Sequence, residues 1–170
     1  MSRDEEFRAY VVTARPALLR TATLLAAGDG HLAEDLVQTA LTKLYVAWPR
    51  VRRDGPEPYV RRILVNAMTD ERRRPWRRER SHEAVPDAPA AEPASMEDRD
   101  AVRRALAALP PRMRAVVVLR YWLELDVAET AAALGCGQGT VKSQTARGLD
   151  RLRELLGPLD APDATPTRSL

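Results

Sequence analysis

The residues that could carry chemistry in this chain gather near its C-terminal end, at positions 138–151. The side chains expected to point outward there can all donate hydrogen bonds, and none is acidic. They are Gln138, Thr140, Lys142, Ser143, Gln144, Arg147 and Arg151. Such groups on one helical face contact the phosphates and base edges of DNA. Gly139 adds a position without a side chain, where the backbone can approach a phosphate.

The residues before this helix predict the motif that would present it. A short stretch rich in alanine, 127–134, is followed by Gly135, which supplies the left-handed conformation of a tight helix exit. Ala131 and Ala132 are expected where the next helix crosses closely, and Val141 should return to the core. These features indicate a helix-turn-helix, with its second helix placed to enter the major groove. An ordinary helical hairpin shares the same local geometry.

Other chemistries fit the sequence poorly. The glycines of this turn resemble a phosphate-binding loop, but the required glycine and lysine would fall at Thr140 and Val141. The two histidines, His31 and His82, do not combine with other residues into a nucleophile, base and orienting group. The single Cys136 excludes an internal disulfide and a cysteine-rich metal site. We therefore expect a protein that is not an enzyme and holds no metal or other cofactor.

The net charge of +3 conceals an uneven distribution. Residues 50–80 hold 11 Arg and 5 acids, giving +6, and residues 101–153 hold 9 basic and 4 acidic residues, giving +5. Between them, residues 81–100 hold 6 acids and one Arg, giving −5. This pattern suggests two polyanion-facing surfaces joined by a segment that avoids the polyanion. Solvated helix faces beside an ordinary linker would give the same charges, and an arginine-rich composition also fits a GC-rich genome.

The composition favours a helical protein inside the cell. Hydrophobic residues make up 45% of the chain and aromatic residues only 5%, so Leu, Val and Ala must fill the core. These residues suit helices better than sheets. The N-terminal segment is acidic and lacks an apolar signal core, and no apolar run approaches membrane-spanning length. We expect a cytoplasmic protein without membrane insertion.

Three helical stretches are predicted in the first half of the chain, at 5–25, 31–48 and 59–74. A Gly-Asp-Gly turn separates the first two, and Pro49 is expected to end the second. The third stretch has its inward positions in adjacent pairs. They are Tyr59 and Val60, Ile63 and Leu64, Ala67 and Met68.

The second half predicts a further helical domain at 98–156. Its helices are expected at 100–109, 112–122, 126–134 and from Gln138 to about residue 155. Residues 79–97 contain three Pro and four Glu but few large apolar side chains, which predicts a flexible acidic linker. The tail, 157–170, is expected to be disordered. The predicted fold is all-α, with two small helical bundles, 1–78 and 98–156, held apart by the linker.

Five stretches of the chain resemble conserved regions of bacterial sigma factors. LAALPPRMRAVVVLRYW (106–122), LGCGQGTVKS (134–143) and RGLDRLR (147–153) are similar to the fourth conserved region. AEDLVQTALTKLY (33–45) and YVRRILVNAMTDER (59–72) are similar to the second. Two matched regions in the right order are far more specific than either alone. Because the chain leaves no room for further sigma regions, it resembles the short extracytoplasmic-function (ECF) class, and within it the actinobacterial SigE-like group.

The resemblance implies three contact surfaces. The second helix would dock on core RNA polymerase through Asp35, Gln38, Leu41, Leu44 and Tyr45. Leu41 and Leu44 fit a hydrophobic core equally well. The second region would read the minus-ten promoter element as single-stranded DNA through Arg52, Arg53, Arg61, Arg62, Asn66, Asp70, Arg72, Arg73 and Arg74. The fourth region would read the minus-thirty-five element as duplex through Gln138, Gly139, Thr140, Val141, Lys142, Ser143, Gln144, Arg147 and Arg151.

Within the last set, Gln144 and Arg147 are the candidates for base contacts. Phosphate contacts are expected from Lys142, Ser143 and Arg151. The chain departs from the family pattern at Gly137, where Ser is common, and at Gln144, where many members carry Arg. A change from Arg to Gln shifts base preference from guanine towards adenine. The partners implied are core RNA polymerase, promoter DNA and, where one exists, an anti-sigma factor. The alternative is a stand-alone helix-turn-helix regulator, which usually dimerises.

Overall fold

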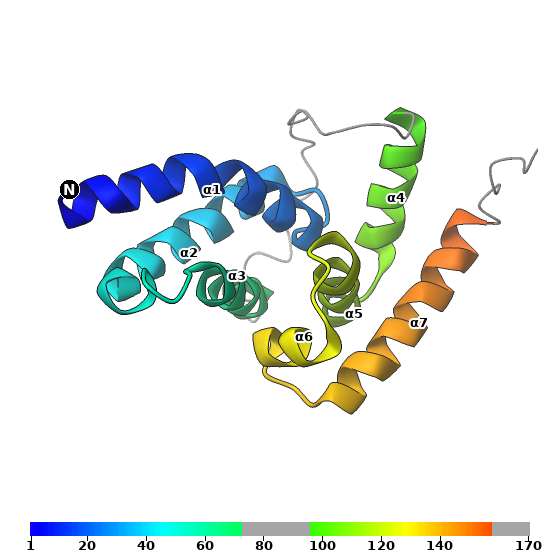
Figure 1. Cartoon of the computed structure of the whole chain (residues 1–170). Helices are drawn as coiled ribbons and strands as arrows, with labels where there is room; N and C mark the ends of the chain where they lie inside the picture. The colour runs from blue at the N-terminus through cyan, green and yellow to red at the C-terminus, as the bar shows by residue number, and fades with distance from the viewer. Residues whose placement is uncertain (73–95, 158–170) are drawn as a thin grey trace, which may run out of the picture.

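The structure is a computed structural model that describes residues 1–72 and 96–157. The first bundle contains three helices, α1 (Arg3–Leu25), α2 (Gly30–Val51) and α3 (Glu57–Arg72). The second contains α4 (Met96–Ala108), α5 (Pro111–Val117), the π-helix η2 (Val118–Trp122), α6 (Val127–Leu134) and α7 (Gln138–Leu156). No β-strand forms among these residues. The predicted all-α fold is confirmed, and α5, η2 and α6 lie between α1–α3 on one side and α4 and α7 on the other (Figure 1).

Most predicted element boundaries agree with the structure to within a few residues. The helix predicted at 100–109 begins earlier, at Met96, so the last two residues of the predicted linker are helical. Residues 79–95 of that linker, and residues 158–170 of the predicted tail, lie outside the described residues. The Gly-Asp-Gly turn between α1 and α2 is confirmed, and Asp29 caps α2 by accepting a hydrogen bond from the Leu32 backbone N–H at 2.9 Å.

The prediction that Pro49 ends α2 is wrong, because the helix continues through it to Val51. Proline lacks the N–H that would bond the carbonyl four residues earlier, which here belongs to Tyr45. The guanidinium of Arg3 donates to this carbonyl oxygen at 2.7 Å. The same guanidinium lies over the Tyr45 ring, 4.5 Å from its centroid. A long-range contact from α1 therefore satisfies the group that Pro49 leaves open.

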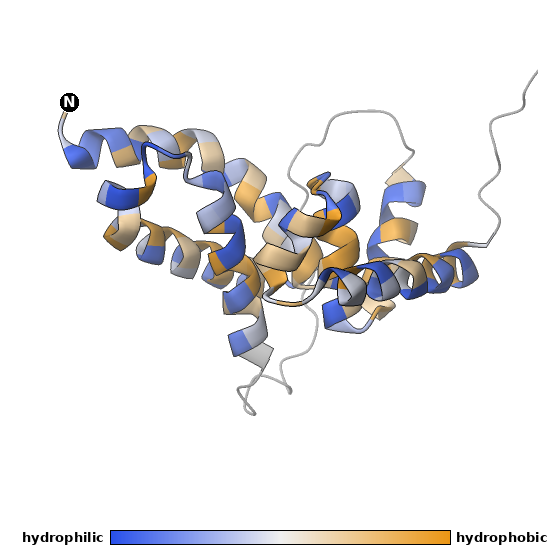
Figure 2. Cartoon of the chain, turned by 60° about the horizontal axis from the view of Figure 1, so that its bottom comes forward, coloured by the Kyte–Doolittle hydropathy of each residue, from blue (hydrophilic) through white to orange (hydrophobic). Residues whose placement is uncertain are grey.

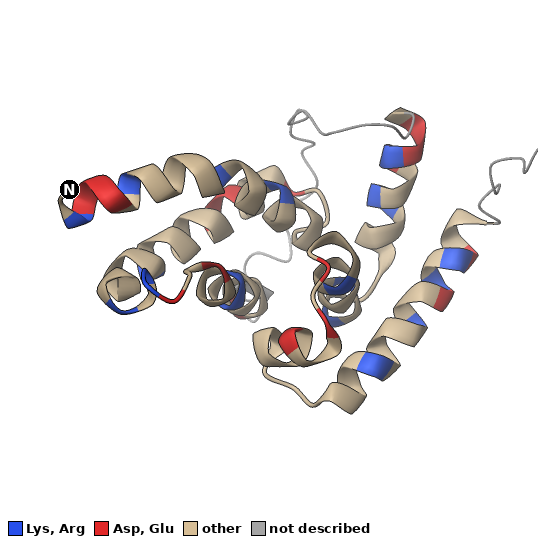
Figure 3. Cartoon of the chain, in the orientation of Figure 1, with Lys and Arg blue, Asp and Glu red and all other residues tan. Residues whose placement is uncertain are grey.

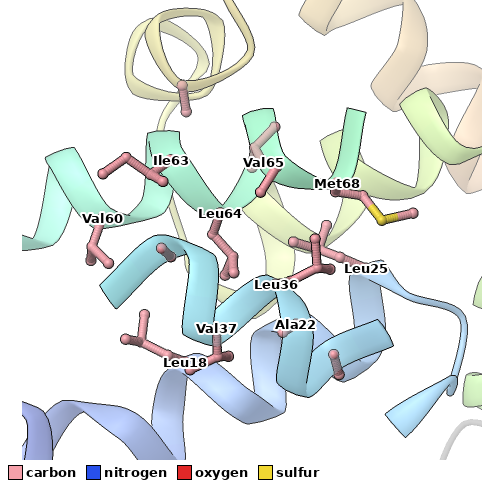
Figure 4. Close-up of a cluster of buried hydrophobic side chains, with 14 of the residues drawn as sticks. Leu18, Ala22, Leu25, Leu36, Val37, Val60, Ile63, Leu64, Val65 and Met68 are labelled. Atoms are coloured by element: carbon pink, nitrogen blue, oxygen red, sulfur yellow. The ribbon is translucent and has the colours of Figure 1, made fainter. Parts of the chain in front are cut away.

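The core of the first bundle forms where α1, α2 and α3 face one another (Figure 4). Leu36 from α2 and Leu64 from α3 are fully buried within it. Of the six positions predicted to face inward on α3, five are buried and Tyr59 is not, since it is 36% exposed. Tyr59 lies one turn from Arg62 on the solvent side of α3. Val65 is buried instead, although the sequence pattern did not place it inside.

The two bundles are not held apart in this structure, which corrects that part of the prediction. Ala115, Leu119 and Ala133 of the second bundle belong to the same buried hydrophobic cluster as the core of the first. The most hydrophobic stretches of the chain accordingly meet at the centre of the molecule (Figure 2). The spacing of apolar residues could not predict this contact. A residue that packs against another domain and one that packs inside its own domain look alike in the sequence.

The helix predicted at 112–122 is confirmed in its extent, but its second half is a π-helix. From Val118 the helix widens into η2, where the Leu123 N–H bonds the Val118 carbonyl oxygen at 3.1 Å. This change leaves Tyr121 and Trp122 about half exposed, at 52% and 48%. The guanidinium of Arg120 then donates to the Leu125 carbonyl oxygen at 2.6 Å, which fixes the turn before α6.

Candidate nucleic-acid interface

The α6–α7 pair has the geometry of a helix-turn-helix. Gly135 closes α6 in the left-handed conformation, with φ of 63°, as predicted. Ala131 is buried at the crossing, as expected, but Ala132 is exposed, and the buried Ala133 belongs to the cluster shared with the first bundle. Val141 is fully buried in a cluster with Ala131, so the prediction that it returns to the core is confirmed, and its side chain anchors α7 and does not face solvent.

A close approach between α5 and α7 fixes the position of α7 near Gly148. A Cβ added at Gly148 would lie 2.7 Å from Val117 Cγ2 and 3.1 Å from Met113 Cγ. Atoms at 2.7 Å overlap, so only a residue without a side chain fits there. Gly148 has no signal in the sequence, because nothing there shows which residues pack opposite it.

The remaining predicted residues of α7 lie on its solvent side. Those that are exposed are Gln138, Gly139, Thr140, Lys142, Ser143, Arg147 and Arg151. Gln144 is partly buried at the edge of this face. Thr140, Ser143, Arg147 and Arg151 are spaced by three or four residues, so they form one continuous stripe along the helix. We call the seven exposed residues, together with Gln144, the α7 stripe.

The electrostatics of the α7 stripe favour an anion. The first turn of α7 has no acidic residue and no side-chain cap, so its backbone N–H groups carry a partial positive charge. Within the described residues, Lys142 and Arg147 form no ion pair, whereas Arg151 pairs with Glu154 at 2.7 Å. Because that pair is exposed, it contributes about 0–1 kcal/mol, and Arg151 can exchange it for a phosphate. The basic residues spread along α7 in Figure 3.

A second polar stripe runs along α3. Arg62, Asn66 and Asp70 are exposed at intervals of four residues and therefore share one face of the helix. Arg62 can bind phosphate, Asn66 can pair with a base edge, and Asp70 can accept a hydrogen bond from an exocyclic base amine. The side chain of Arg72 and the whole of Arg73 and Arg74 lie outside the described residues.

The other predicted arginines of this surface have different surroundings. Arg52 forms an ion pair with Glu6 of α1, whereas Arg53 beside it is exposed. Arg61 is partly buried and lines a cavity of about 270 Å³ between α1, α3 and η2. Tyr10 lines the same cavity, and burial, with a smaller effect of the Glu57 charge, raises the pKa of its hydroxyl to about 12. Arg61 is therefore less exposed than Arg62, Asn66 and Asp70 on the α3 stripe.

The described residues offer little else that could bind a ligand. Among residues 1–72 and 96–157 no group of three or more His, Cys, Asp or Glu side chains is placed to hold a metal ion. The thiol of Cys136 is free and partly buried in the turn between α6 and α7. No helix of the described part is both long and apolar enough to cross a membrane.

Both stripes lie in segments of the chain that match known protein families. Residues 10–78 match the family model Sigma-70 region 2, and residues 99–152 match Sigma-70, region 4. The RNA polymerase sigma-E factor of Streptomyces coelicolor is 40% identical over 158 residues, covering 89% of this chain and 86% of the relative. The chain belongs to the ECF sigma factors. Another relative, the ECF RNA polymerase sigma factor SigM of Mycobacterium tuberculosis, is 38% identical over 133 residues, covering 75% of this chain and 66% of the relative.

Solved structures agree with this membership. The sigma factor RpoE from Bartonella quintana, in complex with the anti-sigma factor NepR, matches with a TM-score of 0.70 and 27% identity. The match covers 89% of this chain and 97% of that one. In this ECF sigma factor, region 2 thus includes α1–α3 with the α3 stripe, and region 4 includes α4–α7 with the α7 stripe.

The predicted polymerase-docking residues of this sigma factor divide into two groups. Leu41 and Leu44 are 7% and 0% exposed, which decides the open alternative in favour of the core. Asp35 and Gln38 are exposed on α2. Tyr45 is 37% exposed, and its hydroxyl donates to Asp4 at 2.8 Å, which raises the pKa of Tyr45.

Two exposed hydrophobic residues of region 2 escaped the sequence analysis of this sigma factor. Tyr59 was predicted to face inward, yet it lies beside Arg62 on the solvent side of α3. Val46 is 70% exposed and follows Tyr45 on the open face of α2. The exposure of these two side chains depends on which faces the neighbouring helices cover, so the sequence pattern alone could not show it.

Proposed function

We propose that this ECF sigma factor binds core RNA polymerase and directs it to specific promoters, where it reads two DNA elements. The observation that carries this proposal is the presence of two exposed polar stripes, on α3 and α7, in separate regions of one chain. One reader would contact duplex DNA and the other the melted strand. The protein is a transcription initiation factor and not an enzyme, and it acts in the cytoplasm, where the polymerase is.

Region 4 would read the minus-thirty-five element through the α7 stripe in the major groove. Gln144 and Arg147 would contact base edges, while Lys142, Ser143 and Arg151 hold phosphates. Gln144 is partly buried at the edge of the stripe, and its side-chain amide can form two hydrogen bonds with adenine. Arg147 has no competing ion pair among the described residues, so its guanidinium is available for a bidentate contact with guanine.

Region 2 would capture the minus-ten element after melting. Arg62 and Asn66 would bind phosphate and a base edge of the unpaired strand, and Asp70 would accept a hydrogen bond from a base amine. Tyr59 adds an exposed ring to this stripe, on which an unpaired base can stack. Arg52 and Arg53, next to the loop before α3, would attract the phosphate backbone of the DNA.

The exposed face of α2 would dock on core RNA polymerase. Asp35 and Gln38 supply polar contacts, and Tyr45 with Val46 supplies apolar surface. The complex of the similar sigma factor RpoE with the anti-sigma factor NepR suggests that an anti-sigma factor regulates this chain as well.

The test is a pull-down of core RNA polymerase followed by run-off transcription from a promoter mapped after overexpression. Arg147→Ala should weaken binding to the minus-thirty-five element by about 1–3 kcal/mol. Transcription that depends on this element should fall as a result. Arg153→Ala on the same helix is the control, because Arg153 pairs with Asp150 and lies off the stripe. Tight binding to an operator without polymerase, and no transcription with it, would instead support a stand-alone regulator.

A further inference from the structure

The first turn of α1 is acidic and lies beside the loop that joins α2 to α3. Asp4, Glu5 and Glu6 all belong to this turn, which stands out at the N-terminus in Figure 3. Negative charge is favoured there, because it lies at the positive end of the helix dipole. Glu6 also forms an ion pair with Arg52, the residue that follows the last turn of α2. This pair connects α1 to the surface proposed to read the minus-ten element.

Other contacts hold the first turn of α1 in place independently of this ion pair. The Arg3 guanidinium donates to the Tyr45 carbonyl oxygen at 2.7 Å, and the Tyr45 hydroxyl donates to Asp4 at 2.8 Å. The Phe7 ring packs edge-on against Tyr45, with 5.1 Å between the ring centroids. The backbone therefore keeps the Glu6 carboxylate close to the loop whether or not it is paired. Loss of the Glu6 charge should not release the turn.

The ion pair leaves most of the Arg52 guanidinium unused. One of its nitrogens donates to Glu6, and no other hydrogen bond of this guanidinium forms among the described residues. Both side chains are 35% exposed, so a phosphate can reach the open edge of the guanidinium. The carboxylate beside it cancels the positive charge that attracts a phosphate. A phosphate must therefore displace Glu6 or accept a negative charge close by, and both cost free energy.

We infer that Glu6 competes with single-stranded DNA for Arg52 and thereby lowers the affinity of region 2 for the minus-ten element. The carboxylate belongs to the same chain, so its effective concentration at Arg52 is constant and does not fall on dilution. DNA gains the Arg52 contact only by exchanging one ion pair for another. This inference rests on the proposed function. It adds that α1, which lies outside the α3 stripe, tunes the affinity for the melted strand.

Glu6→Gln tests this competition, because it removes the charge and keeps the shape of the side chain. The full chain is bound to core RNA polymerase and titrated with a single-stranded oligonucleotide that carries the minus-ten element of a mapped promoter. Core polymerase alone is the blank. Because an exposed ion pair is weak, we expect the Glu6→Gln complex to bind about two- to fivefold more tightly at low salt. The gain should shrink between about 0.05 and 0.5 M salt, since salt screens the competing pair.

Glu34→Gln is the matched control. Glu34, near the start of α2, pairs with Arg15 of α1 at 2.6 Å, so this change also removes one paired negative charge from region 2. It lies at the opposite end of α2 from Arg52 and should leave the affinity unchanged.

A second control uses an Arg52→Gln background. Glu6→Gln should have no effect on DNA binding there, because the competition acts through the Arg52 guanidinium. If Glu6 instead had a purely structural role, its substitution would change the affinity in both backgrounds, and that result would contradict the inference.

Three further outcomes would overturn the inference. One is wild-type affinity in a Glu6→Gln protein that circular dichroism shows to be folded. Another is weaker binding by this variant, which would mean that Glu6 positions Arg52 for DNA. The last is an equal gain in Glu34→Gln, which would assign the effect to net charge and not to Arg52.

Failure of the proposed function would give a different result. The wild-type complex would then bind the oligonucleotide no better than core polymerase alone, and the competition would have no role. If the wild-type complex binds the oligonucleotide and the Glu6→Gln complex matches it at every salt concentration, the proposed function stands and only the inference fails.

Discussion

Substitutions at Gly148 and Gly139 test how closely α7 packs against α5, since both residues lie in α7. Ala is favoured over Gly within a helix by up to about 1 kcal/mol, so the same change should gain helix stability at both sites. At Gly139 an added Cβ meets no atom within 4 Å. At Gly148 it would lie 2.7 Å from Val117 Cγ2, in a buried and closely packed contact.

The two substitutions should therefore change stability in opposite directions. Val117 is β-branched and stiff at χ1, so it cannot turn away without moving its backbone. Overpacking of this kind costs about 1–3 kcal/mol, and the upper half of that range outweighs the gain in helix propensity. We expect Gly148→Ala to lower the free energy of unfolding by about 1–2 kcal/mol. Gly139→Ala should raise it by up to about 1 kcal/mol.

Urea denaturation followed by circular dichroism measures both free energies of unfolding, with the wild-type protein in the same series. Equal slopes of free energy against urea would show that the substitutions act on the same cooperative transition. A Gly148→Ala protein as stable as wild type would refute the reasoning, because α5 and α7 would then have room between them. A large loss in Gly139→Ala would refute the assignment of that position to open space.

Three further predictions concern other parts of the molecule. Thr130 is fully buried in α6, and its hydroxyl has no hydrogen-bond partner among the described residues. Thr130→Val should therefore raise the free energy of unfolding by about 1 kcal/mol, as measured by urea denaturation. A fall in this free energy would show that the hydroxyl has a partner. The folded-state pKa of Tyr10, at about 12, exceeds its ordinary value of 10, so the stability it contributes is complete below pH 10 and is lost as pH rises towards 12. Tyr10→Phe should remove that part of the alkaline loss, and an unchanged pH profile would contradict it. Lys142→Ala should weaken DNA binding similarly on all sequences and reduce the slope of log affinity against log salt by about 1, which a titration at several salt concentrations measures.

Local chemistry made the elements and much of the site predictable from the sequence. Apolar spacing placed the helices, Gly135 marked the left-handed turn, and the polar, non-acidic residues of the α7 stripe could be read directly. These signals act within a few residues of one another, so no tertiary information was needed. The resemblance to two sigma regions, confirmed by the family matches, depended on the same local patterns.

Tertiary structure alone decided which apolar residues belong to the core and which to surfaces. Pro49 stays inside α2 because Arg3, far away in sequence, bonds the carbonyl that proline leaves open. Tyr59 turned outward, and Leu41 and Leu44 turned inward, because neighbouring helices determine which face is covered. The joining of the two bundles was likewise hidden from the sequence. Hydrophobic burial has no direction along the chain, so a periodic pattern shows that a face is buried but not what buries it.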